Sequence, residues 1–471
     1  MSGPVTKAHG YGPNGPPQQR ASDVFKAPSG WVPPLIVVAL LIFVMTLVYL
    51  GSVVNPTGHL HGLPVAIVNE DVGAPVGSRH VNLGQEVASG LTDSRVVASR
   101  LALRFGTLAG MERRMDVGKE YATIVIPAGF TASLLAIADG ASRAGTPAAR
   151  PTIELLTNPR AGTLGVSLAT GVLDPALAQA SRQIGKRLKP TGPREANAAT
   201  SILLADPITV ETIAYRPLPS HTALGLSAFY IALLITFCGF LGGIVVNVSA
   251  DAVLGYAVTE IGPRWSQRQP VAISRWQTLL AKWAMAVPLM VVLTGLMLLA
   301  AVGVLDMNTP HFWDLWLLAW FAATVVALGT LVLFAALGTL GQLIAILVFV
   351  YLALATSGGT VPIEALSGFF RFLAEFEPMR QIVGGTRSVL YFDARGEAGL
   401  TRAYVLTALG LVFWIALGAL ITTWYDRRRL YRMPPALMEY VDRAVRGYKE
   451  ESAQRTATRV EESTTSGHPK I

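Results

Sequence analysis

Few side chains in this sequence have the types and spacing that catalysis or metal binding requires. His59 and His61 stand one residue apart and would supply part of a metal site. No third ligand is in view near them, so a solvated turn beside the membrane is the other interpretation. The single cysteine, Cys238, lies in an apolar run, where we expect a small apolar side chain rather than a reactive thiolate.

A short acidic group follows the first strand-like segment of the chain. Asn69, Glu70 and Asp71 come directly after an apolar stretch, and Gly73 follows them. Carboxylate and amide oxygens would suit a cation here. The same residues are also typical of a turn that ends a strand. Both interpretations remain open, and all four residues are candidates for a functional motif.

The motifs of common catalytic and nucleotide-binding sites do not occur in the chain. We find no G-x-x-x-x-G-K-[ST], C-x-x-C, H-E-x-x-H or G-x-S-x-G. With one cysteine, the chain forms no internal disulfide. We therefore expect no enzyme, no cofactor and no resident metal, and any ATP-driven motor must belong to another chain.

The composition is that of a membrane protein with many spans. Of 471 residues, 52% are hydrophobic and only 14% are charged, and the mean hydropathy is +0.46. Soluble proteins carry about 25% charged residues. The net charge of +8 is explained by basic residues that collect on the cytoplasmic side of membrane spans, so we expect no nucleic-acid partner.

Apolar runs predict six transmembrane helices. Residues 315–357 contain no charge and would form a helix of about 65 Å, twice the bilayer core, so they must form two spans with a turn at 338–342. Lys282 lies near the start of the third span, where we expect it to snorkel to the interface. The predicted spans are 33–54, 223–248, 278–305, two within 315–357, and 401–425.

The insert between the first two spans, residues 55–221, predicts a small exterior α/β domain. Short apolar strands and helical segments alternate there, which is typical of this fold class. The expected strands are 63–68, 100–105, 121–126, 152–156 and 208–215. A helix is expected to begin in 82–91, and a second, over 164–188, to be interrupted at Asp174–Pro175.

The remaining segments are loops and tails. Residues 1–32 predict a disordered cytoplasmic tail, and 251–261 predict a helical segment that ends at Gly262. Residues 358–400 predict an exterior hairpin. Residues 426–471 predict a cytoplasmic amphipathic helix, at 438–449, and a disordered end. The Gly239–Gly243 spacing permits close helix contact, either within the bundle or between two copies.

The distribution of arginines orients the chain. The loop after the second span and the segment after the last span carry clusters of arginines, whereas residues 306–314 contain no Lys or Arg. With an even number of spans, both termini are predicted to be cytoplasmic and the insert to be outside.

One span, a large insert and five further spans resemble the permease fold of type-2 ABC exporters. Residues 63–73 and 121–130 are similar to the phage-infection-protein (YhgE/Pip) branch. The sequence at 357–363, with Gly358, Gly359 and Pro362, resembles that family's step into an exterior hairpin. The resemblance implies a homodimer in a bacterial plasma membrane, in contact with membrane lipid.

The resemblance also implies that the loop after the second span contacts a separate ABC ATPase. The matching candidates are Asp251, Glu260, Arg264, Arg268 and Arg275. The expected function is a permease-like subunit that moves lipidic or amphipathic molecules outward. The alternative is a membrane-anchored scaffold or receptor whose exterior domain binds a partner in the cell envelope.

Overall fold

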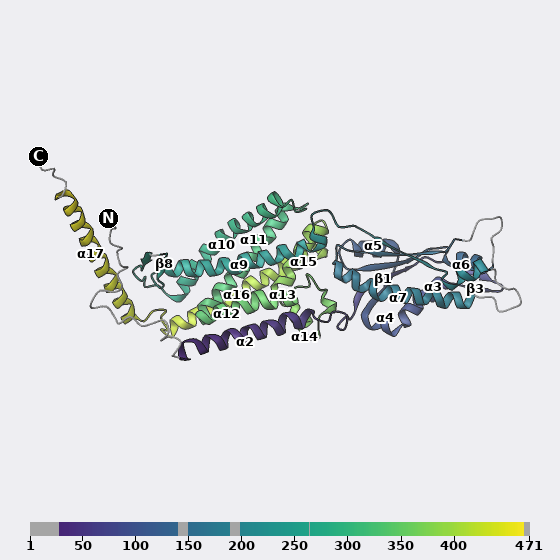
Figure 1. The fold of residues 1–471 in the computed structure, drawn as a ribbon, viewed down its shortest axis with the longest axis horizontal. Helices are drawn as coiled ribbons and strands as arrows, with labels where there is room; N and C mark the ends of the chain where they lie inside the picture. The colour runs from purple at the N-terminus through teal and green to yellow at the C-terminus, as the bar shows by residue number, and fades with distance from the viewer. Residues whose placement is uncertain (1–27, 140–148, 189–197, 263, 466–471) are drawn as a thin grey trace, which may run out of the picture.

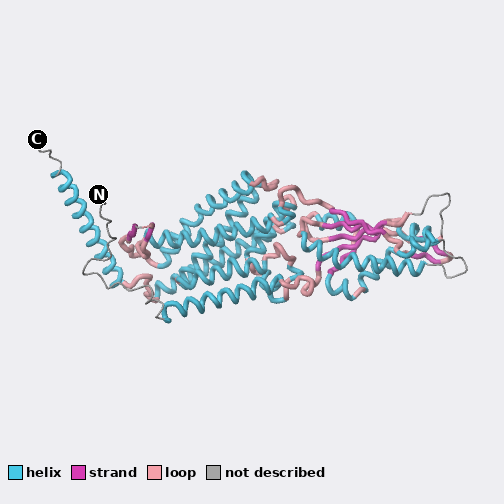
Figure 2. Tube along the Cα trace, in the orientation of Figure 1, coloured by secondary structure: helices cyan, strands magenta, loops and turns pink. Residues whose placement is uncertain are grey.

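The computed structural model describes residues 28–139, 149–188, 198–262 and 264–465. It is mostly helical and elongated (Figure 1). A bundle of long helices lies between an α/β domain at one end and a final helix, α17 (Pro435–Thr465), at the other. We call these the domain end and the terminus end of the bundle. Figure 2 shows that the long strands gather in the α/β domain, at a distance from the bundle.

Six helices are long and apolar enough to cross a membrane, as the sequence predicts. The chain is therefore a multi-pass membrane protein. The spans are Val32–Val53 in α2 (Pro28–Val53), α9 (Ser227–Val253), Arg275–Val304 from α10 (Arg275–Leu298), α11 (Phe312–Leu337), Thr339–Thr356 from α12 (Thr339–Ile346) through α13 (Ala353–Thr356), and α16 (Leu400–Arg427).

Burial distinguishes the centre of the bundle from its edge. In α11, 72% of the most apolar window is buried within the chain, and α9, α10 and α16 all pack against this helix. In α2 the corresponding share is only 6%, and this helix lies along α13 at the side of the bundle (Figure 1). Nearly all of the surface of α2 is thus left for lipid or another membrane helix.

The uncharged segment 315–357 is divided into two helices at a single glycine. Gly338, with φ of +59°, ends α11, and α12 begins at the next residue. The turn therefore falls at the start of the range predicted for it. Gly341 follows at a close approach, since a Cβ there would stand 2.2 Å from the carbonyl oxygen of Leu333. Two consecutive spans can reverse direction within so few residues because both positions lack a side chain.

The α/β domain is built on a five-stranded sheet of order β4-β1-β5-β6-β7. The pairs β4/β1, β1/β5 and β6/β7 are parallel, and β5/β6 is antiparallel. Each strand corresponds to a predicted one, including the edge strand β4. The strands are β1 (Leu63–Asn69), β4 (Leu101–Phe105), β5 (Ala122–Ile126), β6 (Thr152–Thr157) and β7 (Thr209–Ala214).

Alternating side chains divide the domain into two cores. Val65 and Ile67 face the larger core, with α3 (Leu83–Asp93), α6 (Phe130–Ala138) and α7 (Thr163–Leu188). Ala66 and Val68 face a smaller core under α5 (Leu108–Met115). The rest of the domain consists of a short hairpin and two short helices. These are β2 (Ala74–Val76), β3 (Arg79–Val81), α4 (Arg95–Arg100) and α8 (Ala198–Ala205).

The predicted interruption at Asp174–Pro175 is wrong. Helix α7 runs without a break through Pro175. Buried side chains on both sides of the proline, among them Val172 and Leu177, belong to the same core. Packing of this face outweighs the cost of about 3 kcal/mol that a proline imposes inside a helix.

The predicted helical segment over 251–261 is also wrong. Helix α9 ends at Val253, and a left-handed Gly255 with φ of +74° turns the chain. A short hairpin of β8 (Thr259–Ile261) and β9 (Arg264–Ser266) follows, turning at Gly262 with φ of +57°. Glycines in this conformation mark turns, and a helix-period pattern over a few residues could not show that.

The two tails are more helical than predicted. Helix α2 begins at Pro28, within the segment predicted as a disordered tail, and the rest of that prediction lies outside the described residues. Helix α17 contains the predicted amphipathic segment and continues to Thr465, through most of the end predicted as disordered.

The segment between the fifth and sixth spans contains α14 (Gly368–Ala374) and α15 (Pro378–Tyr391), which correspond to the predicted hairpin. Phe369, Phe372 and Phe376 are exposed at and just beyond α14. Aromatic rings are favoured at the depth of the membrane interface. These side chains are therefore suited to anchor the domain end of the bundle.

Candidate functional site

A buried group of charges lies between α9 and α10 at the terminus end of the bundle. Asp251, near the last turn of α9, is 7% exposed, and Lys282 of α10 is 5% exposed. The Lys282 Nζ atom lies 2.7 Å from Asp251 Oδ1 and donates to Asn247 Oδ1 at 2.6 Å. Arg432, beyond α16, pairs with the other oxygen of Asp251.

The prediction that Lys282 snorkels to the interface is wrong. Its side chain lies on the inward face of α10, in line with the buried Leu279 and Ala286. Asp251 supplies the counter-charge that burial requires. Ionisable groups within membrane helices are costly and are usually functional, so this group is the first candidate site.

A second set of contacts brings Arg432 to this place. The carboxylate of Asp426, at the end of α16, accepts the backbone N–H groups of Arg275 and Trp276 at 2.9 and 3.1 Å. The Arg275 guanidinium donates to the carbonyl of Leu430 at 2.6 Å and lies 4.9 Å from the centre of the Tyr425 ring. The start of α10 and the chain that leaves α16 are therefore fixed to each other.

These charges line a cavity of about 570 Å³. It lies between α9, α10, α16 and the turn that joins α11 to α12. Its polar wall consists of Asn247, Asp251, Arg275, Thr278, Lys282, Thr339, Gln342 and Arg432, and its apolar wall includes Val248, Leu279 and Phe334. The cavity presents more cations than carboxylates, together with hydroxyl and amide groups that can donate hydrogen bonds.

The residues predicted to contact an ATPase separate into two groups. Asp251 and Arg275 are engaged inside the chain and cannot form an outer contact surface without losing those partners. Glu260 on β8 and Arg268 after β9 are exposed. Arg264 lies on β9, and its side chain lies outside the described part. The β8–β9 hairpin is thus the part of this loop that remains available.

An apolar groove joins this hairpin to α17. Its volume is about 560 Å³, and it lies between Tyr256 and Val258 of the loop and one face of α17. That face consists of Tyr440, Val441, Ala444, Val445 and Tyr448. Hairpin and helix together form a surface at the terminus end, which we call the loop platform.

In the α/β domain, Asp71 is a structural clasp rather than a cation ligand. Its carboxylate, 6% exposed, accepts the backbone N–H groups of Gly73 at 3.2 Å, Gly84 at 3.0 Å and Thr131 at 3.1 Å. It also accepts the Thr131 hydroxyl at 2.5 Å. Gly84 and Thr131 begin α3 and α6, so one carboxylate satisfies the free amides of two helix starts.

The neighbours of Asp71 complete this turn. Asn69 accepts the Asp71 N–H at 3.2 Å, whereas the side chain of Glu70 is exposed. Gly73 has φ of +72°, and a Cβ there would lie 2.6 Å from His80 Nε2 and from the Val81 carbonyl oxygen. The predicted turn is therefore present. The side-chain oxygens of Asn69 and Asp71 are occupied by backbone amides, so Glu70 is the member of this motif whose carboxylate faces solvent.

His59 and His61 lie in the turn before β1. The Nδ1 atom of His61 is 2.8 Å from the His59 carbonyl oxygen. Within the described ranges, no three His, Cys, Asp or Glu side chains gather in a way that could hold a metal ion.

The predicted hairpin residues lie where the bundle meets the α/β domain. Gly358 has φ of +65° and Gly359 packs on Phe229 of α9, where a Cβ would come within 2.2 Å of the ring. Pro362 precedes a short helical turn, Ile363–Ala365. From α14, Arg371 donates to the carbonyls of Glu364 and Leu366 at 3.1 and 3.0 Å.

Further contacts join the hairpin to the α/β domain. Asp116 of the domain lies 2.9 Å from Arg216 and 3.8 Å from Arg395, which follows α15. Arg160 donates to the Tyr391 carbonyl at 3.1 Å, and the Tyr391 hydroxyl lies 2.7 Å from Ser227 Oγ at the start of α9. The domain, the hairpin and α9 are thereby linked as one packed unit.

Burial changes the ionisation of two acids in this region. Burial raises the pKa of Glu377, which caps α15, to about 8, although backbone N–H groups of Arg380 and Met379 lower it in part. Burial also raises the pKa of Glu364, against the opposing effect of a hydrogen bond to backbone and of nearby arginines. Both acids therefore hold protons more tightly than exposed carboxylates.

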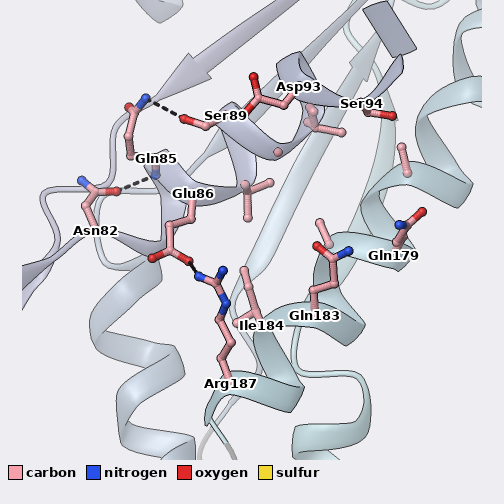
Figure 3. A pocket seen from close by; sticks show the side chains of 15 residues that line it. Asn82, Gln85, Glu86, Ser89, Asp93, Ser94, Gln179, Gln183, Ile184 and Arg187 are labelled. Atoms are coloured by element: carbon pink, nitrogen blue, oxygen red, sulfur yellow. Dashed lines mark hydrogen bonds and ion pairs between the residues drawn. The ribbon is translucent and has the colours of Figure 1, made fainter. Parts of the chain in front are cut away.

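The α/β domain carries a polar groove between α3 and α7 (Figure 3). Its volume is about 630 Å³. The Glu86–Arg187 ion pair, at 2.6 Å, crosses it, and Gln85 and Gln183 lie on the two helices that face each other. The lining is rich in amides and hydroxyls, which suits a polar ligand.

Sequence reasoning missed Asn247, Asp426 and Arg432 as members of the site. The available signal was a lysine inside an apolar span and an aspartate at the end of the preceding span. Each of these charges needs a counter-charge inside the membrane part, so the lysine and the aspartate could have been predicted to form an ion pair.

The comparison with curated proteins gave no match. Among solved structures, the chain is similar to a crystal structure from Thermotoga maritima MSB8 described as "a domain of a putative ABC type-2 transporter". The identity is 21% and the TM-score 0.23, over 32% of this chain and 85% of that chain. The model of a family described as "Protein of unknown function (DUF3533)" matches residues 34–416, and the chain belongs to this family.

Proposed function

We propose that the chain is the permease-like subunit of an ABC-type exporter, which moves lipidic or amphipathic molecules outward using a separate ATPase. In this proposal the membrane is a bacterial plasma membrane, both termini are cytoplasmic and the α/β domain is exterior. Two copies form the working unit. Membership of the phage-infection-protein branch is part of the same proposal.

The course of α9 is the single observation that carries this proposal. At the terminus end, α9 leads directly into the loop platform and carries Asp251. At the domain end, it begins at Ser227, which contacts Tyr391, and Phe229 packs on Gly359. One continuous helix therefore connects the loop platform, a surface suited to a motor, with the unit formed by the α/β domain and the α14–α15 hairpin. Displacement of the platform would be transmitted across the membrane because packed elements move as rigid bodies.

The experiment is a charge reversal on the exposed part of the platform. The full chain carrying both Glu260→Arg and Arg268→Glu should lose its co-purifying ATPase and its ATP-dependent export, while its folding is unchanged. A control at two exposed positions outside the platform, with Glu397→Arg and Arg95→Glu, should retain both. Retention of the ATPase and of export by the first variant would contradict the proposal.

The polar groove between α3 and α7 favours a second candidate function, a membrane-anchored receptor or scaffold that binds a polar partner in the cell envelope. This candidate predicts that replacing residues 256–268 by a short linker leaves function intact, whereas Glu86→Ala with Gln183→Ala abolishes partner binding. The opposite pattern would reject it in favour of the exporter.

A further inference from the structure

The charged cavity at the terminus end differs from an ordinary buried ion pair in its charge balance. Arg275, Lys282 and Arg432 line it, and Asp251 is the one carboxylate in the lining. Asp426 lies behind this lining and is occupied by the backbone amides that begin α10. Even when Asp426 is counted with Asp251, three cations face two carboxylates, so the site has an excess of positive charge.

Neutral donors are placed around the same space. Asn247 and Gln342 carry amide groups and Thr339 carries a hydroxyl group, whereas the Thr278 hydroxyl already donates to the Ser274 carbonyl at 2.9 Å. A phosphate group needs several donors and a positive field, and lysine and arginine provide the strongest contacts to it. At about 570 Å³ the cavity is large enough for a headgroup of moderate size.

An apolar surface leads away from the cavity along α9. Leu241, Val245 and Val248 recur at helical spacing on one face and are 54%, 57% and 59% exposed. Val248 also lines the cavity. A molecule with its anionic group in the cavity could therefore lay an acyl chain along this face, within the lipid layer. A free anion would make no use of this surface.

We infer that the cavity formed by Asp251, Arg275, Lys282 and Arg432 binds the phosphate group of a membrane lipid, with the acyl chains against the exposed face of α9. This inference deepens the proposed function, because it names phosphate-bearing lipids as the substrate class. Asp251 then has a defined role: it bridges Lys282 and Arg432 and holds both in place, and it competes with the incoming phosphate for both cations.

Binding is tested on the purified full chain in neutral detergent, by native mass spectrometry. Four probes distinguish the source of the anion: phosphatidic acid, phosphatidylglycerol, diacylglycerol and inorganic phosphate. We expect both phospholipids to bind, diacylglycerol to bind at least about tenfold more weakly, and inorganic phosphate to be displaced by lipid, since removal of a charged hydrogen bond costs about tenfold or more in affinity. Tight binding of inorganic phosphate with no advantage for the lipids would overturn the lipid assignment.

Substitutions of opposite sign test the site itself. Arg432→Gln should weaken binding of phosphatidic acid about tenfold, whereas Asp251→Asn should strengthen it, because it removes the competing carboxylate while preserving the shape. Arg268→Gln, on the exposed loop, makes the same change in net charge as Arg432→Gln and should leave binding unchanged. Equal effects of Arg432→Gln and Arg268→Gln would overturn the inference.

The outcome is separable from that of the proposed function. If the phospholipids bind with this pattern and no ATPase drives their movement, the exporter proposal fails and the headgroup site stands. If ATP-dependent export occurs and Arg432→Gln binds phospholipid as the unchanged chain does, the headgroup inference fails and the exporter proposal stands.

Discussion

Asp71 in the α/β domain and Asp251 in the bundle are equally buried, at 6% and 7% exposure, but they are held in different ways. Asp71 is surrounded by backbone amides and one hydroxyl, which are fixed by the start of two helices. Asp251 is held by the side chains of Lys282 and Arg432, beside a cavity. The first arrangement cannot change without unfolding. The second consists of side chains that can exchange partners.

This contrast indicates which region of the chain can rearrange when a ligand binds. A carboxylate that is satisfied by backbone groups stabilises one structure. A carboxylate that shares cations with an open cavity can release them to a ligand of the same charge. The Asp71 turn is accordingly a fixed part of the α/β domain, whereas the charges that can exchange partners lie beside the cavity at the terminus end of the bundle.

The largest expected effect is that of Asp71→Ala. Loss of the carboxylate leaves the amides of Gly84 and Thr131 buried without their acceptor, and we expect a loss of about 3–5 kcal/mol in local stability. Hydrogen exchange of the peptides that contain the starts of α3 and α6 measures this loss. No second side-chain change should restore protection. A change below about 1 kcal/mol would show that Asp71 is not a clasp.

Asp251→Leu is expected to cost about 3 kcal/mol, because Lys282 would then be buried without a full counter-charge. In contrast to Asp71, this loss should be rescued. The double variant with Lys282→Met, which removes both buried charges, should return to within about 1 kcal/mol of the unchanged chain. The thermal midpoint in detergent, followed by size-exclusion chromatography, reports it. Additive losses in the double variant would remove the distinction between the two aspartates.

Two glycines test how rigid the Asp71 turn is. Gly73 and Gly77 both have positive φ, but a Cβ at Gly73 meets His80 and Val81, whereas Gly77 faces open space. Gly77→Ala should cost about 1 kcal/mol from the backbone alone, and Gly73→Ala about 2–3 kcal/mol. Urea-dependent proteolysis of the domain compares them. Equal costs would mean that the turn yields to a side chain.

The last comparison concerns Glu377, the third type of buried carboxylate. Its folded pKa of about 8 lies above the ordinary value of 4.5, so the folded hairpin keeps the proton. The resulting stabilisation is complete below pH 4.5 and is lost as the pH rises through 8. Exchange at the start of α15 should therefore increase from pH 5 to pH 8, after correction for intrinsic rates. Glu377→Gln should make this profile flat, and an unchanged slope in that variant would assign the effect to another group.

Continuous apolar runs within single segments made the spans and the strands of the sheet predictable. Hydropathy indicates six helices because each must cross a fixed thickness of lipid, and the break at Gly338 follows from length. The strand around Ile67 and that around Ile124 are apolar and bounded by turns. These patterns arise from local sequence and from burial, so they can be recognised without knowing which other segment each element packs against.

The errors came from interactions that only the folded chain contains. Pro175 stays within a helix because tertiary packing holds both halves, and local propensity cannot show that. Lys282 is buried because Asp251 and Arg432, from other segments, meet it. Of the candidate site, the sequence indicated Asp251 and Arg275 in the right segment. It did not indicate that they turn inward, because the cavity forms only where α9, α10, α11, α12 and α16 meet.

ATP-dependent lipid movement in proteoliposomes is the most direct measurement. The chain is reconstituted with its co-purifying ATPase in vesicles that contain phosphatidic acid with a fluorescent acyl chain, and accessibility of the label to an outside quencher is followed. We predict that ATP changes the accessible fraction, that Glu260→Arg with Arg268→Glu abolishes this change, and that Arg432→Gln reduces it. Equal movement with and without ATP, or full activity of both variants, would contradict the assignment of this chain as the driven membrane subunit of an exporter.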